Sequence, residues 1–344
     1  MKPLVGALSL ARRLLTSWPP EVGQTPSDVV HQENKWRLLR YSQPARQWRT
    51  PILLVPSLIN RHYVLDLAPG RSFVEYLCEQ GHQVYCIDWG TPGDEDRWVT
   101  FDDICDRAIG RALRRVADDS DDGAAHLLGY CLGGTLTAIH TAARPSAVAS
   151  LTALAAPIDF DHGGTLTRWV RTPSFDLDAL TATGNVRWRL MHGAFHLLRP
   201  TLTASKWMSA LDRAGSEEFL DGFLATERWS TDNVSFPAAA YNRYIQALYR
   251  ETQLVRGEFR LGGDRARLEQ IRGPVHVVCF EGDTIVPEAS ATILAERVGA
   301  PDVELWCQRG SHVGSVVSRS AAKGVWGVMG DFWQARDCRQ NRQS

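Results

Sequence analysis

The chain has 344 residues, of which 44% are hydrophobic and 22% charged, and its formal net charge is −1. These values describe an ordinary soluble globular protein, long enough for one large α/β domain with an insertion or for two domains. They give no support to nucleic-acid binding, because there is no excess of positive charge and no basic stripe interleaved with aromatic residues. No apolar run approaches the roughly 20 residues that a membrane span needs, so no transmembrane segment is expected.

The seven cysteines form no C-x-x-C pair and are scattered through apolar runs. An odd number of such cysteines indicates a reducing compartment, and hence the cytoplasm, with mostly buried thiols. The sequence has no cluster of His, Cys and carboxylate residues at metal-ligand spacing, so it gives no support to a metal site.

The first twenty residues contain three basic residues and no acid. A signal peptide is one interpretation, but Arg12 and Arg13 interrupt the apolar part and no clear small-residue cleavage site follows. An amphipathic helix fits better, because apolar residues recur on one face: Leu4, Leu8, Ala11 and Leu15. We expect residues 1–30 to form an N-terminal amphipathic segment that packs on the domain or meets a partner or an apolar surface.

Apolar runs typical of buried strands alternate with helical stretches along much of the chain. The predicted strands are residues 35–41, 51–56, 83–89, 124–128, 147–155, 275–281 and 303–308, and the predicted helices are 71–80, 101–116, 135–143 and 287–298. This alternation predicts an α/β fold, with a mostly parallel sheet and helices on both of its faces.

Residues 158–263 differ from the rest, because they contain no clear strand of this kind and are rich in aromatic residues. They lie between two core strands, so we expect an inserted, mainly helical cap over the carboxyl edge of the sheet, where ligands bind in open α/β sheets. The core would then consist of residues 31–157 and 264–344. Most of the aromatic side chains should form the cap's own core, and a minority should line a channel.

The run Gly129-Tyr130-Cys131-Leu132-Gly133 joins a predicted strand to a predicted helix. Strand, G-x-C-x-G and helix form the layout of a nucleophile elbow, with cysteine in place of the usual serine. A side chain at either glycine would collide with the returning backbone of this strained turn. Cys131 is therefore the candidate nucleophile, and the amide of Leu132 at the helix N-terminus is a candidate oxyanion donor. A buried structural cysteine is the alternative.

A cysteine nucleophile needs a base, and the base needs an orienting carboxylate. Asp283 follows the predicted strand 275–281, and His312 lies in a glycine-flanked loop after the strand 303–308. The order nucleophile, acid, histidine is that of α/β hydrolases, and all three candidates follow strands at the same edge of the sheet. Asp283 could instead cap the helix that follows it. Asp302 is the rival acid, but it precedes its strand and would lie at the opposite edge.

Two further residues are candidates because they follow the predicted strand at 51–56. A second oxyanion amide should come from this loop, and Leu58 is our candidate for it. His62 lies after the same loop and could touch substrate. His126, in contrast, opens the elbow strand at its far end, so a structural role is expected for it.

A thiol nucleophile has chemical consequences of its own. Transfer of an acyl group from a thioester to Cys131 yields another thioester, so the acyl group stays activated and can pass to a weak acceptor such as an alcohol. Because a free thiol has a pKa of about 8.5, His312 must promote formation of the thiolate. This chemistry favours an acyltransferase that uses a thioester over a plain hydrolase, although a cysteine hydrolase on this fold stays open as an alternative.

Beyond these single residues, the sequence resembles the polyhydroxyalkanoate synthases over about residues 51–333. The resemblance rests on Pro51–Asn60, Tyr63–Leu67, Glu79–His82, Val84–Trp89, Gly129–Gly134, the series Trp229, Asp232, Pro237, Tyr249 and Gly257, and on Asp283–Pro287 and Gly310–Gly314. One departure is Thr284, where the family often has histidine, and it leaves the three candidate residues intact.

The resemblance implies an α/β-hydrolase fold that polymerises 3-hydroxyacyl-coenzyme A into polyester and releases coenzyme A, so that the thioester is a substrate and no cofactor is needed. Cys131 would carry the growing chain, His312 would activate it, and Asp283 would assist His312 or deprotonate the incoming hydroxyl group. The length resembles the short catalytic subunits of the two-subunit classes III and IV. A second synthase subunit, a homodimer and a place at the surface of cytoplasmic polyester granules are therefore expected as well.

Two other hypotheses stay open. A cysteine α/β hydrolase, acting as thioesterase or esterase, would resolve the acyl-enzyme with water, which depends on how dry the capped site is. A catalytically silent subunit would only bind polymer or a partner, but it would have no need for Cys131, Asp283 and His312 together.

Overall fold

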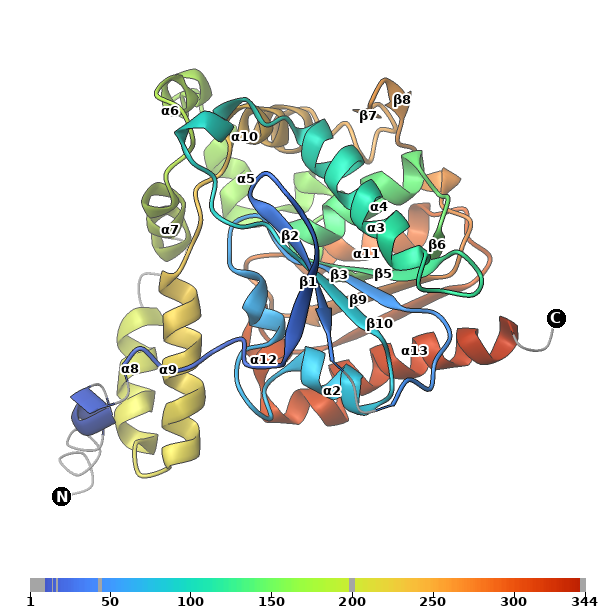
Figure 1. Ribbon diagram of the computed structural model, residues 1–344. Coiled ribbons are helices and arrows are strands. Elements are labelled where there is room, and N and C mark those ends of the chain that lie inside the picture. Colours follow the sequence, from blue (N-terminus) through green and yellow to red (C-terminus); the bar gives the residue numbers. More distant parts are fainter. Residues whose placement is uncertain (1–9, 14, 17, 43–44, 198–201, 341–344) are drawn as a thin grey trace.

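The computed structural model describes residues 10–13, 15–16, 18–42, 45–197 and 202–340. Within these residues the fold is built on an eight-stranded sheet with the strand order β1-β2-β4-β3-β5-β6-β9-β10 (Figure 1). The strands are β1 Ser27–Glu33, β2 Trp36–Tyr41, β3 Ile52–Val55, β4 Val84–Asp88, β5 Ala125–Tyr130, β6 Val148–Leu154, β9 Val275–Glu281 and β10 Val303–Arg309.

From β4 to β10 neighbouring strands run parallel, and β1 and β2 form an antiparallel edge beside β4. The predicted α/β class with a mostly parallel sheet is confirmed, and every predicted strand is present. Side chains of β3 alternate between two separate cores, with Leu53 and Val55 in one and Ile52 and Leu54 in the other. This alternation is that of a strand buried on both faces.

Helices cover both faces of the sheet (Figure 1). One face packs against α3 (Ile109–Ala117), α4 (Leu132–Ala143) and α11 (Glu288–Arg297), and the other against α2 (Phe73–Glu79) and α13 (Val325–Gln340). Nearly every residue of α4 is buried. The helix that follows the elbow therefore lies inside the molecule, where it is held on all sides.

The edge strand β1 was not expected from the sequence. Its seven side chains are exposed or half-buried, so it lacks the apolar run by which the other strands are recognised. The boundary predicted at residue 30 is wrong, because β1 crosses it and pairs with β2.

Between β6 and β9 the chain forms a series of helices. They are α5 Gly164–Val170, α6 Leu177–Ala182, α7 Trp188–Leu197, α8 Leu202–Arg213, α9 Glu217–Thr231 and α10 Ala238–Arg243. In Figure 1, α8 and α9 stand beside the body of the molecule, and α10 lies over it. The division into core and cap stays a prediction, although a small hairpin of β7 (Arg260–Leu261) and β8 (Asp264–Arg265) crosses the boundary expected at residue 263.

The remaining helical turns are short 3₁₀, π or α segments. They are η1 His62–Leu65, η2 Asp94–Trp98, η3 Asp103–Ala108, η4 Phe160–His162, η5 Tyr244–Arg250, η6 Leu268–Gln270, α12 Gly314–Val317 and η7 Arg319–Lys323, of which η3 and η5 are π-helical. Such π segments are frequent at functional sites, and η5 continues α10 toward the candidate site.

Residues 10–13 and 15–16 of the N-terminal segment are helical, and they lie beside α8 and α9 (Figure 1). Leu10 is buried against side chains of this helical pair. Ala11 is exposed and Leu15 is 87% exposed, so these two residues of the predicted apolar face do not pack on the domain, and contact with a partner or an apolar surface stays the prediction for them. The other two residues of that face, Leu4 and Leu8, lie outside the described residues.

Three imidazole rings are buried between the sheet and α13. His82 and His126 pack against Trp333, and His276 stacks on Phe332 at a ring distance of 4.7 Å. Burial lowers the pKa of His82 to about 4, of His126 to about 3 and of His276 to about 4. These histidines are therefore neutral parts of the core at neutral pH.

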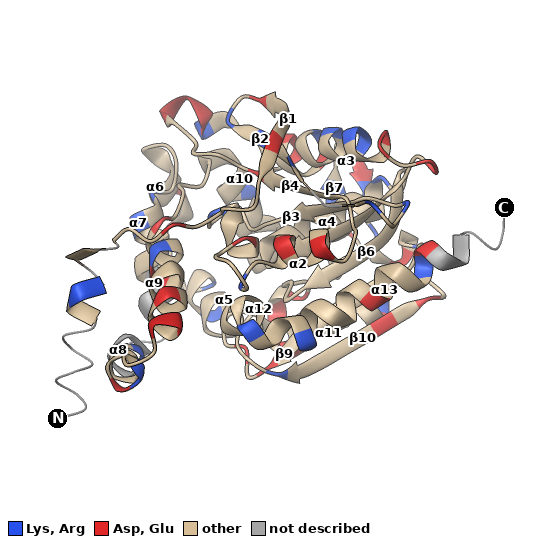
Figure 2. Cartoon of the chain, turned by 60° about the horizontal axis from the view of Figure 1, so that its bottom comes forward, with Lys and Arg blue, Asp and Glu red and all other residues tan. Residues whose placement is uncertain are grey.

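Figure 2 shows acidic and basic residues interspersed along the outer helices, for example on α9 and α13. In the part of the chain that the structure describes, no helix is both long and apolar enough to span a membrane. The same residues contain no group of three or more His, Cys, Asp or Glu side chains placed to hold a metal ion.

Candidate active site

The turn between β5 and α4 has the geometry of a nucleophile elbow. Cys131 adopts φ 56° and ψ −128°, a left-handed conformation that is strained for a residue with a side chain. A Cβ atom on Gly133 would lie 2.0 Å from the carbonyl oxygen of Val55, and one on Gly129 would lie 2.4 Å from that of Gly133. Both glycines are therefore required by close backbone contacts, as predicted. Leu132 is the first residue of α4, where amides have no partner within the helix.

Asp283 and His312 lie together at the same edge of the sheet. His312 Nδ1 is 2.7 Å from Asp283 Oδ2, and both side chains are almost completely buried. The other oxygen of Asp283 accepts the amides of Ile285 at 2.8 Å and Val286 at 3.1 Å. Both carboxylate oxygens are thus occupied, which fixes the orientation of the acid.

Cys131 is a second electrostatic partner of the His312 ring. Burial lowers the pKa of His312, but the interaction with Cys131 and the hydrogen bond that the ring donates to Asp283 outweigh burial and raise this pKa to about 10. The raised pKa favours a protonated His312 ring beside Cys131, and the reactive form of a cysteine nucleophile is the thiolate.

Other thiols have a different environment. Cys78, Cys86 and Cys105 are buried, and burial raises the pKa of Cys86 and Cys105 well above that of a free thiol. Cys279 is buried too, while Cys307 is partly exposed. The prediction of mostly buried thiols is therefore confirmed for the described cysteines, and among them Cys131 has the histidine partner.

Tyr130 supports the histidine loop, and the sequence analysis did not single it out. Its hydroxyl donates to the backbone oxygen of His312 at 3.0 Å, and its ring stacks on the imidazole at 5.3 Å. The residue directly before a nucleophile ends the elbow strand, and this position could have been used as a signal.

A cavity lies over Cys131, with a free volume of about 70 Å³. This holds a few water molecules but not an acyl chain with its carrier. The lining is mostly apolar and includes Trp169, Phe175, Tyr241, Tyr244 and Tyr249 from the cap region. Fewer than half of the aromatic residues in that region reach the cavity, in agreement with the sequence prediction. A bound acyl-coenzyme A therefore needs more room than this cavity holds.

Two of the tyrosines that line this mostly apolar cavity form a hydrogen bond with each other. The Tyr244 hydroxyl donates to the Tyr249 hydroxyl at 3.4 Å. Burial is the largest of the effects that raise the pKa of both residues. Both hydroxyls therefore stay protonated and can act as hydrogen-bond donors.

The loop after β3 passes directly beside the elbow. The carbonyl oxygen of Pro56 would lie 2.8 Å from a Cβ on Gly133, and it accepts a hydrogen bond from Trp89 Nε1 at 3.0 Å. The Leu58 side chain points into a different cavity, beside Trp89, whereas Ile59 lines the cavity at Cys131. A backbone amide from this loop as second oxyanion donor, with Leu58 as its source, stays a prediction.

His62 has a different neighbour from the one expected. Its Nδ1 lies 3.2 Å from Asp88 Oδ1, and the residue is not part of the lining of the cavity at Cys131. Although burial raises the pKa of Asp88, the contacts with His62 and Arg37 and the amide of Gly90 keep it below its usual range. A substrate contact of His62 stays a prediction.

The structure also tests the alternative roles of Asp302 and Asp283 and the structural role expected for His126. Asp302 accepts a hydrogen bond from Arg336 at 2.6 Å and precedes β10, at the edge opposite Cys131. The residue before α11 is Pro287, so Asp283 does not cap that helix. His126 is buried with its Nδ1 2.8 Å from Ser150 Oγ, which agrees with a structural role.

Comparison with known proteins adds to this geometry. The family model described as alpha/beta hydrolase fold matches residues 50–306, and the model described as Poly-beta-hydroxybutyrate polymerase (PhaC) N-terminus matches residues 19–77. Poly(3-hydroxyalkanoate) polymerase subunit PhaC of Haloferax mediterranei is 34% identical over 319 residues. The PhaC subunit of Allochromatium vinosum is 30% identical over 328 residues, which cover 94% of this chain and 92% of that protein. The chain belongs to the PhaC family.

The matched part of this PhaC-family chain is 92% of its length but only 65% of the Haloferax subunit. Among solved structures, a soluble variant of monoglyceride lipase from Saccharomyces cerevisiae has a TM-score of 0.59 at 13% identity, over 93% of this chain and 99% of that one. An alpha/beta hydrolase fold protein from Nakamurella multipartita has a TM-score of 0.52 at 18% identity, over 91% and 99%. These two likenesses show the fold alone, and they confirm the predicted α/β-hydrolase architecture.

Proposed function

We propose that the protein polymerises 3-hydroxyacyl-coenzyme A into polyester and releases coenzyme A, with Cys131 as the acyl carrier. One observation carries the proposal: a cysteine on a nucleophile elbow faces a buried His312–Asp283 pair in an apolar, covered cavity. Membership of the PhaC family supports the polymer as product, because the relatives are named poly(3-hydroxyalkanoate) polymerase subunits.

In the first step the Cys131 sulfur bonds to the carbonyl carbon of the thioester. The carbonyl oxygen becomes an oxyanion, which the amide of Leu132 and the expected amide of Leu58 would stabilise. When this intermediate collapses, the bond to the coenzyme A sulfur breaks, and the leaving sulfur takes the proton from His312. The product is an acyl-enzyme whose thioester keeps the activation of the substrate.

In the second step the hydroxyl of another hydroxyacyl-coenzyme A attacks the acyl-enzyme. His312 takes the proton of this hydroxyl, its oxygen bonds to the acyl carbon, and the bond to the Cys131 sulfur breaks. The released coenzyme A thioester is one unit longer and acylates Cys131 again. Because both oxygens of Asp283 already hold other groups, we assign it the orientation of His312 rather than direct deprotonation of the hydroxyl.

The cavity lining supports an alcohol as acceptor. Apolar and aromatic side chains surround Cys131, and an apolar, covered site disfavours free water while an acyl chain fills it. A cysteine hydrolase would need an open path for water to the acyl-enzyme. An acyl chain that fills the small free volume of the cavity would leave little room for such a path.

We further propose that the chain acts together with a second synthase subunit, as a homodimer and at the surface of polyester granules. The relatives from Haloferax and Allochromatium are both named as subunits, which supports an assembly of more than one chain.

Coenzyme A release from 3-hydroxybutyryl-coenzyme A, with analysis of the acyl product, tests the proposal. Wild type and Cys131→Ala should be compared, each with and without a candidate second subunit. We expect insoluble polyester from wild type and none from the variant. Free hydroxybutyrate that depends on Cys131, with no polymer, would establish the hydrolase instead. Absence of release even with the second subunit would contradict any catalytic role.

A further inference from the structure

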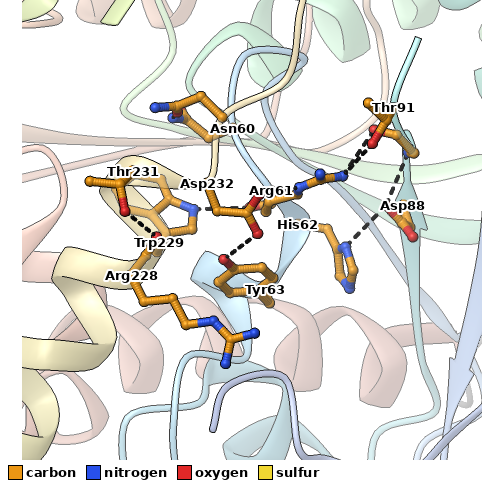
Figure 3. A network of polar contacts seen from close by, with 12 residues as sticks. Asn60, Arg61, His62, Tyr63, Asp88, Thr91, Arg228, Trp229, Thr231 and Asp232 are labelled. Carbon is orange, nitrogen blue, oxygen red and sulfur yellow. Dashed lines mark hydrogen bonds and ion pairs between the residues drawn. The ribbon is translucent and has the colours of Figure 1, made fainter. Parts of the chain in front are cut away.

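A second polar network lies beside the candidate active site, where the C-terminal end of α9 meets the loop after β3 (Figure 3). The loop residues are Asn60, Arg61 and Tyr63, and the α9 side is formed by residues 229–234. This network joins the cap region to the loop from which the second oxyanion amide is expected, and none of its members is part of the proposed catalytic chemistry.

Asp232 is the centre of the network. Its Oδ1 accepts Arg61 Nε at 3.0 Å, and its Oδ2 accepts the Tyr63 hydroxyl at 2.8 Å. The Asp232 amide donates to the carbonyl oxygens of Arg228 and Trp229 at the end of α9. The Asp232 carboxylate thus lies at the end of α9 and binds the side chains of Arg61 and Tyr63 at once, as Figure 3 shows.

Neighbouring contacts hold the loop backbone itself. Trp229 Nε1 donates to the carbonyl oxygen of Arg61 at 3.0 Å, and the amide of Val234 donates to that of Ile59 at 3.3 Å. Asn60 pairs with Asn233 through both backbone and side chain. Three successive loop residues are therefore fixed by the cap region.

The other side of the loop is held by the core. Arg61 Nη1 donates to the hydroxyl of Thr91 at 2.9 Å and to the carbonyl oxygen of Gly90 at 3.3 Å. Trp89 Nε1 holds the carbonyl oxygen of Pro56. The amides of residues 57 and 58 lie between these fixed points, so their direction depends on contacts at both ends of the loop.

We propose that Asp232 is a positioning residue for the oxyanion hole: it fixes the loop at residues 58–61 so that a loop amide faces the carbonyl oxygen of the thioester on Cys131. This inference rests on the proposed acyl transfer. A bound acyl-coenzyme A needs more room than this cavity holds, so if the cap opens to admit it, the oxyanion hole would be complete only when the end of α9 is seated on the loop again. Closure of the cap and assembly of the site would then be one event.

The exposure of Asp232 and the precise placement that an oxyanion donor needs indicate how strongly removal of Asp232 should act. The Asp232 side chain is 39% exposed, so its ion pair with Arg61 stabilises the fold little by itself. An oxyanion donor, however, must lie within a few tenths of an ångström of its place, and loss of one donor costs about 10²–10³ in kcat. We therefore expect the removal of Asp232 to affect acyl transfer far more than stability.

The test compares two reactions of the same thiol. Acylation of Cys131 by 4-nitrophenyl butyrate passes through an oxyanion and releases nitrophenolate. Alkylation by iodoacetamide displaces iodide at a saturated carbon and forms no oxyanion. For Asp232→Ala we expect acylation to slow by about ten- to a hundredfold, chiefly in kcat, with alkylation at the Cys131 peptide unchanged within twofold. Loss of both rates together, or of neither, would overturn the proposal.

One control variant lies on α9, and two further variants change Asp232 itself or its pair with Arg61. Glu227 on α9 forms an ion pair with Lys206 at 2.7 Å and does not contact the loop, so Glu227→Gln should leave both reactions unchanged. Asp232→Asn, which keeps the size and one acceptor oxygen, should lie between wild type and Asp232→Ala. The double variant Arg61→Ala with Asp232→Ala should be no slower than the slower single variant; additive losses would contradict a shared action on the loop.

The two proposals fail in different ways. If wild type reacts with 4-nitrophenyl butyrate but not with 3-hydroxybutyryl-coenzyme A, even with a second subunit present, the polymerase function fails. The role of Asp232 would still be decided by the nitrophenyl ester. If wild type forms polymer while Asp232→Ala acylates at the wild-type rate, the positioning role alone fails.

Discussion

Two groups of buried histidines in this molecule have opposite electrostatics. His312, at the carboxyl edge of the sheet, has Asp283 and Cys131 as partners, and its pKa is raised to about 10. His82, His126 and His276, under α13, have pKa values lowered to between about 3 and 4. Burial by itself lowers the pKa of all four histidines. The partners of His312 therefore account for its raised pKa. Glu304 also acts on His276 without reversing the shift, so the comparison shows that an acid hydrogen-bonded directly to the ring, with Cys131 beside it, is what overcomes burial.

The largest effect should follow from removal of His312. In His312→Gln we expect the rate of coenzyme A release to fall at least about a thousandfold, because the variant lacks both the base and the cation that stabilises the thiolate. Cys131→Ser should be impaired to a similar extent, whereas Cys307→Ser, at a partly exposed thiol outside the site, should keep wild-type activity. A His312→Gln enzyme within tenfold of wild type would remove the base assignment.

The pKa of His312 should itself depend on its partners. NMR titration of the imidazole should give a midpoint near 10 in wild type. In Asp283→Asn combined with Cys131→Ala we expect a midpoint at or below that of a free histidine, about 6.5, because only burial then acts. Folding raises the pKa of His312, so the protonated ring stabilises the folded protein. This contribution to stability is complete below pH 6.5 and is lost as the pH rises through 10. An unchanged midpoint would show that neither partner controls the ring.

The histidines under α13 should make the fold sensitive to acid. Burial is the largest cause of the lowered pKa of His276, with Glu304 opposing it and Arg336 adding to it. The unfolded chain takes up a proton below pH 6.5 and the folded one only near pH 4, so stability falls between these values by roughly 3 kcal/mol for one such group.

His276→Phe should remove one such loss, because neither ring nitrogen has a hydrogen-bond partner among the described residues and the ring already stacks on Phe332. Urea unfolding at pH 4.5 and pH 7.5 measures the difference. The variant should lose less stability on acidification than wild type. An equal loss in both proteins would show that His276 titrates normally in the folded state.

The smallest effect is expected at Tyr130. Tyr130→Phe removes the hydrogen bond to the His312 backbone and keeps the ring stacked on the imidazole. One neutral hydrogen bond contributes about 1 kcal/mol, so we expect roughly a fivefold decrease in kcat with KM unchanged. A loss as large as that of His312→Gln would mean that the hydroxyl takes part in the chemistry.

The sequence predicted the parts of the site that follow directly from strand order. Cys131, Asp283 and His312 each come just after an apolar run, and parallel strands place their carboxyl ends at one edge. The need for Gly129 and Gly133 could also be predicted. The backbone passes close to both positions in any elbow of this kind, here at Val55 and at Gly133 itself.

Other features depend on contacts between segments that are distant in the sequence. β1 was missed because an exposed edge strand has no apolar pattern. The neighbour of His62 could not be foreseen, because Asp88 lies 26 positions away at the end of β4. Asp232 belongs to a motif of the resemblance, but its contact with Arg61 is between residues 171 positions apart. No local pattern indicates such a contact.

The central claim is that Cys131 carries a growing polyester chain, and mass spectrometry of the enzyme during turnover tests it most directly. Wild type is mixed with 3-hydroxybutyryl-coenzyme A, quenched in acid at early times and digested. We predict a ladder of adducts on the peptide that contains Cys131, spaced by one hydroxybutyryl unit. A single-unit adduct that decays to free acid, or an unmodified Cys131 while polymer accumulates, would contradict the account.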